Sequence, residues 1–270
     1  MTPSADADRP ILLDARAVSK RFGGLSALSE VSLAVRTGEI VGLIGPNGAG
    51  KTTFFNCLTG LYQPSSGTVH LDGVSLAGRK PHAVAALGLA RTFQNIRLFA
   101  NMTVLENAMV GRHVRSRAGV LGAVLRDPRT RAEERSIRER SMEVLSWVGL
   151  AAQAERQARH LPYGDQRRLE IARALATEPR LLALDEPAAG MNPTETESLK
   201  RLLEEIRGRG LTLLLIEHDV RLMMGLCDRV AVLDYGRKIA DGPPCEVQRN
   251  PAVIDAYLGA GAAESGAAHA

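Results

Sequence analysis

The sequence contains few aromatic residues and no long apolar run. Phenylalanine, tryptophan and tyrosine together make up 4% of the 270 residues, so a buried core must consist mainly of leucine, valine, isoleucine and alanine. The apolar stretches fall short of the ~18 residues that a membrane-spanning helix needs. The first residues, MTPSADADRP, lack the basic-then-apolar pattern of a secretory leader. These absences predict a cytosolic chain that reaches a membrane only through a partner.

Cysteine is also scarce. Cys57, Cys227 and Cys245 stand far apart, without pairing or metal-ligand spacing. An odd number of widely spaced cysteines argues against a disulfide framework and against a cysteine zinc site. We expect reduced thiols, most of them buried.

The charge balance is basic, with a net charge of +4 and a pI of about 9.2. This balance fits a nucleotide, a nucleic acid or a membrane surface as partner, and fits equally an arginine-rich soluble surface. Basic residues outnumber acids over residues 112–140. A solvated helical face is the preferred interpretation of that segment, and contact with RNA, DNA or lipid headgroups is the alternative.

Strand and helix patterns alternate along the chain. Apolar segments rich in leucine and β-branched residues predict strands over residues 11–22, 28–45, 67–76, 180–187, 211–219 and 229–242. Helical patterns cover residues 50–59, about 81–161, 219–226 and a helix that begins at the Asn-Pro-Thr-Glu cap of residues 192–195. Near-continuous apolar strands that alternate with helices predict a parallel sheet covered on both faces.

The strongest local motif is a phosphate loop at residues 45–53, GPNGAGKTT, which matches G-x-x-x-x-G-K-[ST] between an apolar strand and a helix. Its glycines let backbone N–H groups turn toward phosphate oxygens, and the helix N-terminus adds positive potential. Lys51 would reach the β- and γ-phosphates, and the Thr52 hydroxyl would hold Mg²⁺. The predicted nucleotide-binding residues are Gly45, Pro46, Asn47, Gly48, Ala49, Gly50, Lys51, Thr52 and Thr53.

An acidic pair, Asp185 and Glu186, ends the apolar segment LLALDEP. The carboxyl ends of parallel strands meet at one edge of a sheet, where open α/β folds bind ligands. Asp185 therefore suits Mg²⁺, bound through water, and Glu186 suits a general base that polarises the attacking water. By itself the pair would be interpreted as structural, and only its place beside the phosphate loop indicates catalysis.

The phosphate loop, the turn LPYGDQ at residues 161–166 and the strand ending in Asp-Glu, in this order and spacing, resemble the ATP-binding cassette family. The resemblance covers roughly residues 10–258. It implies an α/β fold of the P-loop NTPase type: a RecA-like, mostly parallel sheet, an N-terminal antiparallel β subdomain, and a helical subdomain inserted at about residues 95–160. Residues 1–9 and 259–270 are expected to be disordered tails.

The same resemblance implies an ATPase with ATP and Mg²⁺ as cofactors and two cassettes stacked head to tail around two ATP molecules. Tyr163, Gly164 and Asp165 occupy the turn that faces the nucleotide of the other subunit. The family's usual turn carries a serine and two glycines where this chain has Pro162, Tyr163 and Gly164. The contact across the dimer would therefore depend on the Gly164 backbone and on the helix dipole.

Three more residues take roles only through the resemblance, because each alone would more often be structural. Gln94, in RTFQN, fits the loop glutamine that senses Mg²⁺ and the attacking water and links to a transmembrane partner. His218, in LLLIEHD, fits the γ-phosphate switch histidine. Phe22, in KRFGG, fits the aromatic residue that stacks on adenine. Asn192 stands where aspartate is commoner in the family.

Within the family, RTFQNIRLFANMTVLENAMVGRH, LDEPAAGMNP and the ending NPAVIDAYLG look like ATPase subunits of branched-chain amino-acid importers. This likeness implies a second, identical or paralogous cassette, transmembrane permease subunits, and indirectly a periplasmic solute-binding protein. It places the chain peripherally on the cytoplasmic face of the inner membrane, with no nucleic-acid partner. The sequence does not identify the solute, because the solute never touches the ATPase.

Several alternatives remain at this point. A cassette for lipopolysaccharide export shares part of the C-terminal pattern, and a soluble cassette acting on DNA or ribosomes would suit the basic segment. A GTPase is disfavoured because the sequence lacks an Asn-Lys-x-Asp guanine motif. A degenerate, regulatory cassette is disfavoured by the presence of Lys51, Asp185, Glu186 and His218.

Overall fold

The computed structural model describes residues 9–115 and 128–257, and within these ranges the strands form two sheets. The first is antiparallel, with the strand order β2-β1-β4-β5. Alternating buried and exposed side chains in its two long strands leave one face in the core and one in solvent. The strands are β1 (Ile11–Phe22), β2 (Leu25–Arg36), β4 (Ser66–Leu71) and β5 (Val74–Ser75).

The second sheet is mostly parallel, with the order β10-β9-β3-β8-β7-β6. Every residue of its three central strands is buried, which is why these segments read as continuous apolar runs. Because β3, β8 and β7 are parallel neighbours, the segments that follow them emerge at one edge. The strands are β3 (Ile40–Ile44), β6 (Leu89–Arg91), β7 (Leu181–Asp185), β8 (Thr212–Ile216), β9 (Arg229–Asp234) and β10 (Arg237–Gly242).

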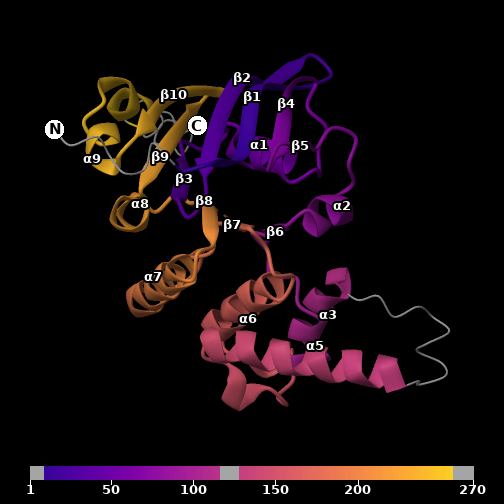
Figure 1. The fold of residues 1–270 in the computed structure, drawn as a ribbon. Helices are drawn as coiled ribbons and strands as arrows, with labels where there is room; N and C mark the ends of the chain where they lie inside the picture. Colours follow the sequence, from indigo (N-terminus) through magenta and orange to yellow (C-terminus); the bar gives the residue numbers. More distant parts are fainter. Residues whose placement is uncertain (1–8, 116–127, 258–270) are drawn as a thin grey trace.

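Helices cover the parallel sheet and form a separate arm. They are α1 (Lys51–Leu58), α2 (Pro81–Ala86), α3 (Val104–Arg112), α5 (Pro128–Trp147), α6 (Tyr163–Leu175), α7 (Pro193–Gly208), α8 (Val220–Leu226) and α9 (Pro244–Val247), with 3₁₀ turns at His113–Arg115, Ala151–Gln153 and Ala158–His160. Figure 1 shows the arm, which consists of α3, α5 and α6, below the sheets and away from α1. The predicted cap of α7 is confirmed, since Asn192 and Glu195 form a reciprocal capping box.

One expectation about local structure is wrong. The helical pattern predicted from Pro81 to Leu161 is interrupted by the strand β6, and the chain does not return to helix until Val104. β6 has only three residues, and it forms because it pairs in parallel with β7, Leu89 opposite Leu181. A strand this short carries no measurable period of two, so its pairing partner, far away in sequence, determines it.

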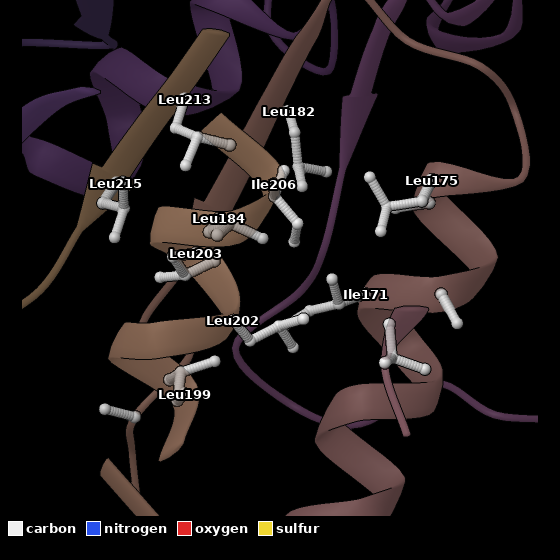
Figure 2. Packing of buried hydrophobic residues seen from close by; sticks show 14 of the residues in the cluster. Ile171, Leu175, Leu182, Leu184, Leu199, Leu202, Leu203, Ile206, Leu213 and Leu215 are labelled. Carbon is white, nitrogen blue, oxygen red and sulfur yellow. The ribbon is translucent and has the colours of Figure 1, made fainter. Parts of the chain in front are cut away.

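The arm and the sheet share one core. α7 has leucine or isoleucine at positions i, i+3, i+4 and i+7, which form one face of a helix. Figure 2 shows this face directed at the leucines of β7 and β8, with side chains of α6 alongside; the residues are Ile171, Leu175, Leu182, Leu184, Leu199, Leu202, Leu203, Ile206, Leu213 and Leu215. This packing fixes the two strands whose carboxyl ends carry the predicted acidic and histidine residues.

The basic segment 112–140 lies partly outside the described residues. In its described part, three arginines pair with carboxylates: Arg112 with Glu178 at 2.8 Å, Arg138 with Glu155 at 2.9 Å and Arg140 with Glu178 at 3.1 Å. Arginines paired in this way have less of their charge available to a nucleic acid, and the pairs favour the interpretation as a solvated helical face. Among the described helices, none combines the length and apolarity needed to cross a bilayer.

Candidate functional site

An open pocket of about 590 Å³ lies over the phosphate loop. Its floor is formed by residues 47–53, and Phe22 and Ala27 of the antiparallel sheet line one part of it. Glu186 and the hairpin residues Tyr235–Gly236 complete the lining. The pocket therefore joins both sheets around the start of α1.

The backbone of the phosphate loop requires glycine at two positions. Gly45 has φ 148° and Gly50 has φ 98°, conformations that L side chains rarely adopt. A Cβ at Gly45 would lie 2.1 Å from the Leu233 carbonyl oxygen, and one at Gly50 would lie 2.8 Å from that of Ala27. The loop thus turns tightly between neighbouring strands and directs the first amides of α1, which have no intrahelical acceptor, at the pocket.

Lys51 lies across this loop. Its Nζ donates to the carbonyl oxygens of Gly45 at 2.6 Å and Pro46 at 3.0 Å, and the residue is 9% exposed. Burial lowers the pKa of Lys51, and the negative charge of Glu186 acts against that shift. A buried ammonium held by neutral carbonyls is stabilised further by an anion, so the arrangement suits a phosphate.

Asp185 is buried at the edge of the parallel sheet and is bonded to an arginine that the sequence did not single out. Arg91, the last residue of β6, donates from Nη2 to Asp185 Oδ2 at 2.8 Å. Burial raises the pKa of Asp185, and the hydrogen bond and charge of Arg91 oppose that rise. Thr52, whose hydroxyl is the other predicted oxygen ligand for Mg²⁺, is exposed at the start of α1.

The three predicted catalytic side chains lie together. Gln94 Nε2 donates to Glu186 Oε2 at 2.8 Å, and His218 Nδ1 lies 3.8 Å from the same oxygen. Glu186 has φ 48°, an uncommon conformation for a residue other than glycine, and its N–H donates to the Ile216 carbonyl at 2.9 Å. Backbone strain of this kind often accompanies functional sites, and here it directs the carboxylate into the pocket between two loops.

A second buried carboxylate, that of Glu217, binds the backbone next to these predicted catalytic side chains. Glu217 is 1% exposed; its Oε1 accepts from the Ala188 N–H at 2.7 Å and its Oε2 from the His218 N–H at 3.2 Å. Burial raises the pKa of Glu217, and these hydrogen bonds oppose the rise. Glu217 thereby ties the segment after Glu186 to the end of β8.

The turn LPYGDQ begins α6, with Pro162 at the N-cap. The Tyr163 hydroxyl donates to the Ala189 carbonyl at 2.9 Å and accepts from Arg167 at 3.1 Å. Gly164 is buried against Glu195, and Asp165 Oδ2 accepts from Gln153 at 3.1 Å. Among the described residues that line the pocket, none comes from this turn. Within one chain, the turn therefore does not contribute to the pocket over the phosphate loop.

Aromatic side chains stand at the mouth of the pocket. Phe22 is 44% exposed, and its ring meets Tyr62 edge-on with centroids 5.4 Å apart. Tyr235, in the hairpin between β9 and β10, is 88% exposed and lines the same pocket. Phe22 is thus accessible to a flat ring, and its stacking on adenine stays a prediction.

Sequence reasoning missed Arg91, Glu217 and Tyr235. Arg91 stands three residues before Gln94 in the quoted segment RTFQN, and Glu217 directly precedes His218, so adjacency to a predicted residue was the available signal. Tyr235 precedes Gly236 in a two-residue hairpin, where Tyr-Gly marks a turn without indicating a pocket.

Comparison with known proteins agrees with this geometry. The profile of the family described as ABC transporter matches residues 28–189, and that of the family described as Branched-chain amino acid ATP-binding cassette transporter matches residues 237–263. The high-affinity branched-chain amino acid transport ATP-binding protein LivG of Salmonella typhimurium is 49% identical over 92% of this chain and 98% of its own length. BraF of Pseudomonas aeruginosa, described in the same words, is 48% identical over 93% and 98%.

Among solved structures, the ADP conformation of MJ1267, an ATP-binding cassette of an ABC transporter, superimposes with a TM-score of 0.81 at 30% identity. The match covers 93% of this chain and 99% of that one. The predicted α/β cassette fold, with its antiparallel and mostly parallel sheets, is confirmed. The chain therefore belongs to the ABC transporter family of ATP-binding cassette ATPases.

Proposed function

We propose that this chain is the ATP-hydrolysing subunit of an importer for branched-chain or related amino acids. The observation that carries the proposal is the match of residues 237–263 to the branched-chain cassette family, together with LivG and BraF at 48–49% identity over nearly their whole length. The alternatives, a lipopolysaccharide-export cassette or a soluble cassette acting on nucleic acid, have less support from these likenesses.

We assign residues 10–258 to one cassette domain with a helical insertion at about residues 95–160. The packing of α3 against α5, within that range, supports the insertion. The expected tails at residues 1–9 and 259–270 lie outside the described residues, apart from Arg9, and stay a prediction.

ATP would lie in the pocket with its phosphates on the loop 45–53 and its base near Phe22. Lys51 would exchange its bonds to the Gly45 and Pro46 carbonyls for phosphate oxygens. Thr52, Gln94 and Asp185 offer a hydroxyl, an amide and a carboxylate, the hard oxygen donors that suit Mg²⁺. Within the described residues, no group of three or more acidic, histidine or cysteine side chains could hold a metal ion. A Mg²⁺ ion bound here would take phosphates and waters as its other ligands. It would neutralise part of the phosphate charge.

Hydrolysis would use the cluster at the carboxyl edge of the sheet. Glu186 accepts a proton from water aligned with the γ-phosphate, and Gln94, bonded to Glu186 Oε2, fixes the direction of that carboxylate. His218 Nδ1 lies 3.8 Å from Glu186 Oε2 and 63% of its side chain is exposed, so it would be accessible to the same phosphate. These three roles stay predictions that substitution can test.

A second cassette, identical or paralogous, would complete the site. The pocket of one chain is open, and no residue of its own LPYGDQ turn is among those that line it. Head-to-tail pairing would bring the Gly164 end of α6 over the neighbour's phosphates, where the helix N-terminus favours negative charge. Closure would exclude water from the reacting atoms.

Closure of the pair would move the attached permease subunits, which in turn receive solute from a periplasmic solute-binding protein. This chain would lie on the cytoplasmic face of the inner membrane. Differential affinity of ATP for the closed pair is what would drive the attached subunits. No nucleic acid is required.

Purification of the tagged chain from membranes of its own host tests the proposal. We expect co-purification of permease subunits of a branched-chain amino-acid importer, and ATP-dependent uptake when these are reconstituted together. Recovery with lipopolysaccharide-export membrane subunits, or salt-dependent binding to a defined DNA or RNA without membrane partners, would replace this function with one of the alternatives.

The Pro162→Ser variant tests the unusual turn. Pro162 is the N-cap of α6 and makes no side-chain cap bond, whereas serine is a favoured N-cap that would stabilise the helix by about 1 kcal/mol. We expect equal or higher ATPase activity, because the added hydroxyl would also approach the neighbour's γ-phosphate. The comparison is steady-state phosphate release at saturating ATP, with melting temperature measured in parallel. A large loss of activity in a folded variant would mean that proline itself is required in this turn.

A further inference from the structure

Arg91 is an arginine with a largely buried side chain that is bonded to Asp185, and none of the predicted roles explains it. It ends β6, which pairs with β7 so that Arg91 lies opposite Ala183. Asp185 is two residues further along β7, at the same carboxyl edge. The Arg91 side chain is 10% exposed and that of Asp185 5%. Burying two charges is costly unless their hydrogen bonds are well made, so the geometry of this pair matters.

The guanidinium of Arg91 uses its planar donors on three separate segments. Nη2 donates to Asp185 Oδ2 at 2.8 Å. Nη1 donates to Asn56 Oδ1 at 2.6 Å and to Thr59 Oγ1 at 2.9 Å, both on the helix that follows the phosphate loop or at its end. Nε donates to the Thr92 carbonyl at 3.3 Å. Arginine suits this position because its fork is rigid, whereas lysine presents a single ammonium group.

Two aromatic rings hold the guanidinium in its plane. Its central carbon lies 4.6 Å from the ring centroid of Phe55, on α1, and 5.1 Å from that of Phe93. Phe93 is the residue before Gln94, so the contact continues into the loop that reaches Glu186. Arg91 therefore touches the phosphate-loop helix, the carboxylate at the end of β7 and the Gln94 loop at once.

We propose that Arg91 is a positioning residue for the metal-dependent step. It holds Asp185 Oδ2, so the direction of the second carboxylate oxygen, Oδ1, is fixed as well, and it keeps that direction in register with α1 and with the Gln94 loop. Asp185 would then be the carboxylate that helps to hold Mg²⁺ when ATP is bound, with Oδ1 as the oxygen not used by Arg91. The inference depends on the proposed function. Groups that orient a metal-binding carboxylate in this way commonly change metal affinity by about 10- to 100-fold when altered.

The test compares Arg91→Lys with Arg229→Lys. Arg229 is the control because it is another largely buried arginine that pairs with carboxylates, in its case Glu39 at 2.7 Å and Asp241 at 2.6 Å, but it lies at the opposite edge of the sheet. Both substitutions keep the charge and remove the fork. If losing an arginine ion pair lowered Mn²⁺ affinity only by disturbing the fold, both variants would lose affinity to a similar extent.

Two measurements separate positioning from folding. The first is Mn²⁺ binding, followed by electron paramagnetic resonance, to protein saturated with a non-hydrolysable ATP analogue. The second is the affinity for the same analogue in excess chelator. For Arg91→Lys we expect Mn²⁺ affinity to fall by about tenfold while metal-free nucleotide affinity stays within about twofold of the parent. Arg229→Lys is expected to leave both unchanged.

Asn56→Ala provides a second variant that alters no ionic group. It removes one anchor of Arg91 on α1, and we expect a smaller loss of Mn²⁺ affinity, about threefold, in the same direction. Parent-like Mn²⁺ affinity in both Arg91→Lys and Asn56→Ala, or equal losses in Arg91→Lys and Arg229→Lys, would overturn the positioning role. Failure of the parent protein to bind the analogue at all would contradict the proposed function, and this inference with it.

Discussion

Glu186→Gln is expected to reduce steady-state ATP hydrolysis at least about a hundredfold while ATP binding is retained. The new amide oxygen can still accept the hydrogen bond from Gln94 Nε2, now 2.8 Å from Glu186 Oε2, so the geometry of the pocket is kept. What is lost is a group that can take a proton from water. Removal of a negative charge beside the γ-phosphate also favours the bound nucleotide.

Phosphate release measures the first effect and calorimetry with ATP the second. If the pairing of two cassettes is correct, ATP should also convert the Glu186→Gln variant, alone or with its paralogous partner, into a dimer visible by light scattering. Glu155→Gln is the control, because Glu155 is an exposed carboxylate that is bonded to Arg138 and is not among the residues that line the pocket. Hydrolysis by Glu186→Gln at the parental rate would show that another group acts as the base.

The sequence alone predicts the core of the parallel sheet. The central strands β3, β7 and β8 are continuous apolar runs, and the residues that follow each of them carry the candidate chemistry, so local pattern and motif were sufficient there. The same holds for α7, where the Asn192 cap and the spacing of its leucines are local properties. The positions of Lys51, Asp185 and His218 at one edge follow from parallel pairing alone.

The parts that could not be predicted depend on contacts between distant segments. β6 exists because it pairs with β7, and Arg91 is a site residue because β6 does so; the residues of the Arg91–Asp185 pair are 94 positions apart. The bond from Tyr163 to the Ala189 carbonyl depends likewise on how α6 packs near the segment after β7. The positive φ of Glu186 could not be predicted either, because a glutamate does not indicate this conformation as a glycine would. Propensity describes a residue's neighbours in sequence, and these features are set by neighbours in space.

Lys51→Ala is expected to weaken ATP binding by about ten- to a hundredfold, the effect of losing a charge-assisted contact to phosphate. Lys51 is buried, and its Nζ donates to the Gly45 and Pro46 carbonyls. It therefore lies beside the N-terminus of α1, which would receive the phosphates. The substitution removes the ammonium but leaves the glycine-rich backbone, so residual affinity should come from the loop amides and from Phe22.

Calorimetry with ATP and with ADP measures this loss, and inorganic tripolyphosphate, which has no base, separates the phosphate contacts from stacking. Because Lys51 acts on phosphate, its removal should weaken tripolyphosphate at least as much as ATP. Lys80→Ala is the control, since Lys80 is an exposed lysine before α2 and makes no side-chain cap bond. Unchanged affinity for all three ligands in a folded Lys51→Ala variant would mean that the phosphates lie elsewhere, and the pocket over residues 45–53 would lose its assignment.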